Sequence, residues 1–168
     1  YVYALERAAE LFTWFAGLDR SDELAKKAQE FYLEADRTRT AVYNLCYDYS
    51  SGLLADIPLD DPNRDMYKHG IFSQHTNILG ILTNAFPEDD VPGVMEKILS
   101  DTSLIPTTIY YRFYLFQALQ KTGMADRYTD MLGSWERMLA NGLTTFQESD
   151  VLERSDCHAW SSSPLYHF

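Results

Sequence analysis

The sequence predicts an all-α chain built from αα-hairpins. Apolar residues recur at helical spacing along most of its 168 residues, and short turns alternate with longer polar connections. No segment shows the strict alternation of apolar and polar residues that a half-buried strand requires. With 46% hydrophobic residues, the composition is that of a globular chain of about one domain.

The first two helices form the first predicted hairpin. One apolar face runs from Val2 to Phe15, and Gly17 should end this helix. Ser21 has the side chain of an N-cap, so we expect it to begin a second helix that runs to about Tyr47.

A second hairpin is predicted after a long polar loop over Tyr49–Gly70. Ser73 is the expected N-cap of a third helix, which should run to about Ala85. Pro92 suits the first turn of a fourth helix, ending near Ser100. Polar loops of this length are usually functional or disordered.

Three more helices follow. The fifth is rich in aromatic residues and is predicted after Pro106, over 107–121, and the sixth over 125–139. A polar connection over 142–156 leads to a seventh helix that begins near Asp156. Both ends of the sequence fall inside helical patterns, so we expect residues 1–168 to be part of a longer chain.

Hairpin geometry predicts where chemistry should be found. Because successive helices run antiparallel, alternate connections lie at opposite ends of the array. The connections 48–72, 101–106 and 142–156 should therefore share one face, at the N-termini of the third, fifth and seventh helices. Helix N-termini present free N–H groups to ligands, so we expect the functional site on this face.

Composition excludes several classes of function. The chain has 14 basic against 25 acidic residues, a net charge of −11, which argues against nucleic-acid partners and anionic membranes. No apolar run approaches the roughly 18 residues of a membrane span. No zinc or phosphate-loop motif occurs, so we expect no cofactor. Asp60, Asp61 and Asp65 lie in a proline-containing loop and not on one helix face, so we expect no metal ion either.

Carboxylates gather in the last polar connection, which contains Glu148, Asp150, Glu153 and Asp156. A carboxylate beside polar and aromatic groups can act as a general acid or base. The alternative is a capping arrangement, in which Ser155 or Asp156 caps the next helix and Glu148 is solvated.

Polar residues also begin the third helix. Gln74, His75 and Asn77 are candidates to bind hydroxyl groups. The alternative is a helix cap followed by buried polar side chains.

Several blocks together resemble one glycosidase family. They are Gly142-Leu-Thr-Thr-Phe-Gln-Glu148, then Ser155-Asp-Cys-His-Ala-Trp-Ser161 and Pro164-Leu-Tyr166, with Phe72-Ser-Gln-His-Thr-Asn-Ile-Leu79 and the aromatic helix upstream. The pattern is similar to the C-terminal part of the catalytic domain of bacterial α-L-rhamnosidases, glycoside hydrolase family 78 and relatives. That family has a Gly-x-Thr-Thr-x-x-Glu loop before a helix carrying Ser-x-x-His. The likeness spans roughly residues 70–168.

The resemblance implies a fold and a mechanism. The fold is a six-hairpin (α/α)6 barrel, of which residues 1–168 would be a partial catalytic domain, with the sugar bound at the N-terminal ends of the inner helices. The mechanism is inverting hydrolysis by an acid and a base roughly 6.5–9.5 Å apart. Glu148 matches the general base. The residues expected to contact the sugar are His158, Trp160, Gln74, His75, Tyr110 and Tyr111.

The sequence departs from the family in two ways. Gln147 stands where many members have Trp, so the identity of the sugar is open. The general acid has no counterpart, so we expect the isolated chain to be inactive and to expose apolar helix faces where further hairpins would pack. The expected partners are a carbohydrate and the remaining hairpins. The alternatives are a non-catalytic helical domain that binds sugar or protein, and a six-hairpin glycosidase for another sugar.

Overall fold

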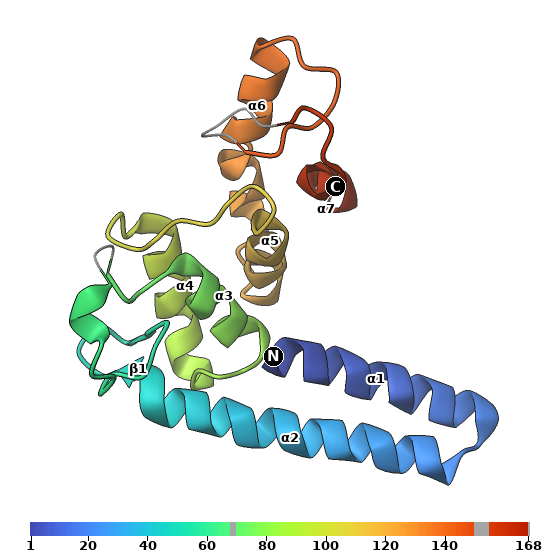
Figure 1. Cartoon of the computed structure of the whole chain (residues 1–168). Helices are drawn as coiled ribbons and strands as arrows, with labels where there is room; N and C mark the ends of the chain where they lie inside the picture. The colour runs from blue at the N-terminus through green and yellow to red at the C-terminus, as the bar shows by residue number, and fades with distance from the viewer. Residues whose placement is uncertain (68–69, 150–154, 168) are drawn as a thin grey trace.

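The chain is mostly helical, as predicted (Figure 1). The structure is a computed structural model and describes residues 1–67, 70–149 and 155–167. The α-helices are α1 (Val2–Asp19), α2 (Asp22–Cys46), α3 (Gln74–Leu82), α4 (Val91–Ser100), α5 (Arg112–Lys121), α6 (Gly133–Ala140) and α7 (Pro164–His167). Short 3₁₀ helices are η1 (Arg64–Met66), η2 (Glu88–Asp90), η3 (Ala125–Met131) and η4 (Ala159–Ser162). None of the described helices is long and apolar enough to cross a membrane.

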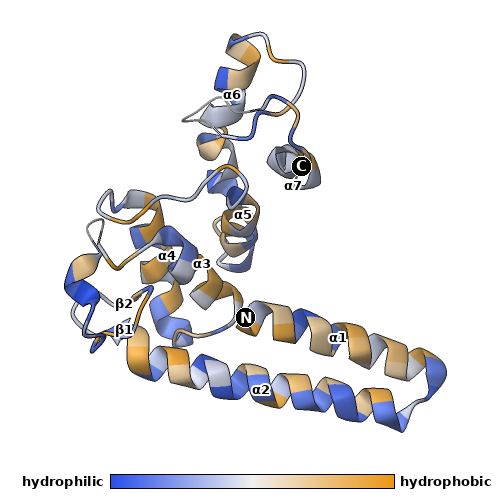
Figure 2. Cartoon of the chain, viewed as in Figure 1, coloured by the Kyte–Doolittle hydropathy of each residue, from blue (hydrophilic) through white to orange (hydrophobic). Residues whose placement is uncertain are grey.

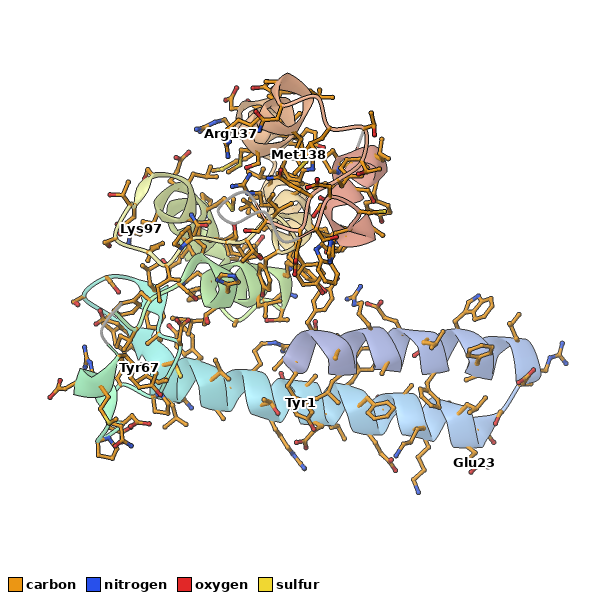
Figure 3. All side chains as sticks on the ribbon, turned by 45° about the horizontal axis from the view of Figure 1, so that its top comes forward. Tyr1, Glu23, Tyr67, Lys97, Arg137 and Met138 are labelled. Carbon is orange, nitrogen blue, oxygen red and sulfur yellow. The ribbon has the colours of Figure 1, made fainter. Side chains whose placement is uncertain are left out.

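Helices α1 and α2 form an antiparallel hairpin that projects from the rest of the chain, with the turn near Glu23 farthest away (Figures 1 and 3). The first helix continues past the predicted stop at Gly17 to Asp19. Arg20 then takes the left-handed conformation with φ of 48°, so a non-glycine residue makes the turn. Ser21 caps α2 as predicted, because its side chain accepts a hydrogen bond from the Leu24 N–H.

Much of the apolar surface of this hairpin is exposed. The residues it buries most deeply are small, with Ala9, Ala28 and Ala35 at 0–4% exposure. On α1, large apolar side chains at helical spacing remain 41–61% exposed, namely Leu11, Trp14, Phe15 and Leu18. Figure 2 shows that hydrophobic residues predominate along α1. The expectation of exposed apolar helix faces is therefore confirmed.

The core lies between α3, α4 and α5. It is built from fully buried aliphatic residues, chiefly Ile78, Ile81, Ile98, Leu115 and Leu119. Burying large aliphatic side chains contributes about 1.5–3 kcal/mol each. Because residues of α3 and α5 pack in this core, the core holds in place the N-terminus of α3 and the segment that leads into α5.

The expectation of no strand was wrong for one short hairpin. Strands β1 (Tyr47–Asp48) and β2 (Leu53–Leu54) pair antiparallel at the start of the predicted polar loop. The buried Asn77 amide, on α3, supplies the reason. It accepts from the Leu54 N–H at 2.9 Å and donates to the Leu54 carbonyl at 3.1 Å, so it pairs with Leu54 as a strand would. A buried side chain 23 residues away thus organises this segment.

Three of the later helices differ from the prediction. The fifth begins at Arg112, because residues after Pro106 form turns first. The predicted sixth helix is divided into η3 and α6 at Leu132. No regular helix begins near Asp156, because η4 starts at Ala159 and α7 only at Pro164, whose missing N–H suits a first turn.

Candidate functional site

The N-terminus of α3 is where the first two predicted connections meet. Ser73 pairs with Ile105 in a parallel bridge, with the Gln74 N–H donating to the Ile105 carbonyl at 2.9 Å. Asp56, just beyond β2, reaches the same place, because its Oδ1 accepts from the Ser73 hydroxyl at 2.6 Å and from the Thr76 hydroxyl. The prediction that connections 48–72 and 101–106 share a face is therefore confirmed.

Two of the polar residues in this segment hold the backbone. The Gln74 amide donates to the Ile98 carbonyl at 2.8 Å and accepts from the Thr107 N–H at 2.8 Å. Asn77 is 0% exposed, and its amide also donates to the Ser73 carbonyl at 2.8 Å. Asn77 is therefore no binder of external hydroxyl groups, which corrects that expectation. The role of Gln74 towards a sugar stays a prediction.

His75 lies on the accessible side of the same turn. Its ring packs against Tyr111 with 4.3 Å between centroids, and the Tyr111 hydroxyl donates to the His75 carbonyl at 3.3 Å. Burial lowers the pKa of His75, and the nearby Asp56 carboxylate offsets part of that shift. Burial also raises the pKa of Tyr111, so its hydroxyl stays protonated at neutral pH.

A row of rings connects His75 to His158. The ring centroids are 5.0 Å apart for Tyr111 and Tyr114, 6.4 Å for Tyr114 and Tyr110, 5.8 Å for Tyr110 and Trp160, and 4.5 Å for Trp160 and His158. We call these six residues the aromatic row. Five were predicted to contact a sugar and Tyr114 was not. Tyr110 is 46% and Trp160 47% exposed, so the row offers apolar ring surface to a ligand.

The Glu148 loop reaches this row through its backbone. The Glu148 N–H donates to the Ser155 carbonyl and the His158 N–H to the Phe146 carbonyl, both at 2.8 Å. The two sides of the loop are thus held together, and Glu148 lies two residues from the partner of His158. The capping alternative is wrong, since no regular helix begins at Ser155 or Asp156. Asp150 and Glu153 lie outside the described residues.

Two groups at this end have no hydrogen-bond partner among the described residues. Glu148 is half-buried, and within the described ranges no hydrogen bond or ion pair engages its carboxylate. The His158 Nδ1 atom is buried and also has no hydrogen-bond partner in this part of the structure. A carboxylate without a polar partner can take up a proton from a bound ligand or water.

Asp56 is the residue of this site that the sequence did not single out. It is exposed, and its charge acts on both His75 and Tyr111. In the same loop, Asp60, Asp61 and Asp65 were the acidic residues considered as metal ligands, and in the described part of the chain no three acidic, His or Cys side chains gather as a metal site. One sequence feature could have indicated Asp56: the apolar run Leu53–Ala55 directly before it is typical of a buried segment, which would hold the next residue in place.

Comparison with known proteins gives one structural likeness to report. No protein-family model and no curated protein matches the sequence. The fold is similar to that of a crystal structure of a GH78 family rhamnosidase of Bacillus sp. GL1, with a TM-score of 0.69 and 21% sequence identity. The match covers 84% of this chain and 16% of that chain. The chain therefore has an all-α fold that resembles a small part of that enzyme.

Proposed function

We propose that this chain is the C-terminal part of a glycosidase barrel of the α-L-rhamnosidase type, with Glu148 as general base. The observation that carries the proposal is the Glu148 carboxylate, which engages no described residue and belongs to a loop whose backbone is hydrogen-bonded to that of His158, at one end of the aromatic row that begins at His75. The likeness in fold to a GH78 rhamnosidase supports the same assignment.

The proposed mechanism uses Glu148 to activate water. The carboxylate takes a proton from a water molecule while the water oxygen attacks the anomeric carbon opposite the leaving group. The glycosidic oxygen leaves with a proton from a second carboxylic acid, so the configuration inverts. We assign that acid to another hairpin of the parent barrel. The 168-residue chain alone should then have no hydrolase activity, and robust turnover of an aryl α-L-rhamnoside by it would overturn this division of roles.

The aromatic row is proposed to hold the sugar. The exposed rings of Tyr110 and Trp160 suit the apolar face of a pyranose, while His158 and His75 can bond hydroxyl groups. The exposed apolar residues of α1 are proposed to pack against a neighbouring hairpin in a six-hairpin barrel, since a helix with two apolar faces needs a partner on each.

A base variant in the full-length protein that contains this chain tests the proposal. Glu148→Gln keeps the shape and removes the base, so kcat on an aryl α-L-rhamnoside should fall by about 100- to 10,000-fold. Glu88→Gln, at an exposed position in η2, is the matched control and should leave kcat unchanged. If Glu148→Gln keeps a near-normal kcat, Glu148 is not the base, and a non-catalytic sugar-binding domain becomes the better interpretation.

A further inference from the structure

Asp56 is a fixed and exposed carboxylate that the mechanism above does not use. Its backbone N–H donates to the Ile71 carbonyl at 2.7 Å, and Leu54, two residues earlier, is held by the Asn77 amide. Its Oδ1 accepts the Ser73 and Thr76 hydroxyls. Among the described residues no cation pairs with it, and no donor reaches its Oδ2. The carboxylate is therefore held in place on one oxygen and unengaged on the other.

Hydrogen bonds place this carboxylate at the turn that carries His75. Its Oδ1 accepts the hydroxyls of Ser73 and Thr76, which precede and follow His75 in the sequence, and His75 packs on Tyr111 at the beginning of the aromatic row. The charge of Asp56 also acts on the pKa values of His75 and Tyr111. The ring nitrogens of His75 make no hydrogen bond to the described part of the chain. A carboxylate oxygen accepts from hydroxyl groups and an imidazole can donate or accept, so the pair suits two neighbouring hydroxyls of one sugar ring.

We propose that Asp56 is a further sugar-binding residue, which with His75 holds hydroxyl groups of the ligand at the end of the row opposite Glu148. This inference rests on the proposed function, because it assigns a further binding residue to the same sugar site. A fixed carboxylate makes charge-assisted hydrogen bonds without losing side-chain entropy on binding, which favours its use for orientation of the substrate.

Kinetics of the full-length protein test this assignment. Asp56→Asn keeps an Oδ1 acceptor for Ser73 and Thr76, while the charge and the acceptor at Oδ2 are lost. KM for an aryl α-L-rhamnoside and the inhibition constant of free L-rhamnose should both rise at least tenfold. Asp60→Asn, an exposed change in the same loop, should leave both constants unchanged. Constants within twofold of wild type for Asp56→Asn would overturn the proposal.

Two further variants separate a failure of the Asp56 inference from a failure of the proposed function. Thr76→Val keeps the Asp56 carboxylate and removes one of the two hydroxyls that hold it, so KM should rise several-fold. If Asp56→Asn does not fold, an unchanged KM in Thr76→Val overturns the inference. Glu148→Gln reports on the proposed function itself through kcat. A near-normal kcat there rejects Glu148 as the base, whereas a lost kcat in Glu148→Gln together with an unchanged KM in Asp56→Asn rejects only the role of Asp56.

Discussion

Replacing Asn77 with Asp tests how the site is held together. The Asn77 amide is fully buried and makes three hydrogen bonds, one accepted from and one donated to Leu54, and one donated to the Ser73 carbonyl. Aspartate has nearly the same shape. A protonated carboxyl group has one donor, so one buried carbonyl loses its partner at a cost of about 1–3 kcal/mol. An ionised carboxylate has none.

Ionisation makes the penalty depend on pH. Burial without a compensating cation raises the pKa of the new carboxyl above the roughly 3.9 of the unfolded chain. A raised pKa in the folded state means that stability is lost as pH increases above the unfolded value, by about 1.4 kcal/mol per pH unit until the folded pKa is reached. Between pH 5 and 7 the Asn77→Asp penalty should thus grow by up to about 2.7 kcal/mol.

Urea unfolding followed by circular dichroism measures this penalty. The free energy of unfolding of Asn77→Asp should lie about 2–5 kcal/mol below wild type at pH 5, and the gap should widen at pH 7. Asn44→Asp, an exposed change on α2, should cost less than about 0.5 kcal/mol at either pH. A gap of the same size at both pH values would refute the buried-amide argument, because it would mean that position 77 reaches water.

Three further predictions concern other parts of the chain. Arg20→Gly should raise the free energy of urea unfolding by about 1 kcal/mol, because the left-handed φ of 48° strains any residue with a Cβ; no gain over Arg20→Ala would contradict this. Because the pKa of His75 is lowered in the folded state, its contribution to the free energy of unfolding is complete above the ordinary pKa of about 6.5 and is lost as pH falls below that value. His75→Gln should flatten the dependence of the unfolding free energy on pH below about 6.5. An unchanged slope would show that His75 does not cause this dependence. Tyr110→Ala in the full-length protein should weaken L-rhamnose binding roughly tenfold by calorimetry, while the exposed Tyr49→Ala should not, and equal affinities would remove Tyr110 from the site.

The all-α class and the meeting of connections 48–72 and 101–106 at one face followed from the sequence, because local signals predict helices and antiparallel hairpins place alternate connections at one end. Apolar spacing predicts helices, and Ser21 and Ser73 act as the N-caps that their positions indicated. The β1–β2 hairpin could not be predicted, because its pairing depends on the distant Asn77 amide.

The sequence predicted most residues of the candidate site, but it did not predict how these residues contact one another. His75, Tyr111 and Trp160 lie on the aromatic row, and the sequence predicted all three as sugar contacts from residue types and the family resemblance. Asp56 could not be found, because only the folded loop brings it to the N-terminus of α3. The break between η3 and α6 has no strong sequence signal, since only Gly133 interrupts a continuous helical pattern.

Azide rescue tests whether Glu148 activates the attacking water, as proposed. In full-length Glu148→Ala the base is absent, but azide needs no deprotonation and can attack the anomeric carbon itself. If Glu148 is the base, kcat on an aryl α-L-rhamnoside should be severely reduced in this variant. Azide should restore turnover and give β-L-rhamnosyl azide, the inverted product, which NMR identifies. A near-normal kcat without azide, or a rhamnosyl azide of retained configuration, would contradict this role of Glu148.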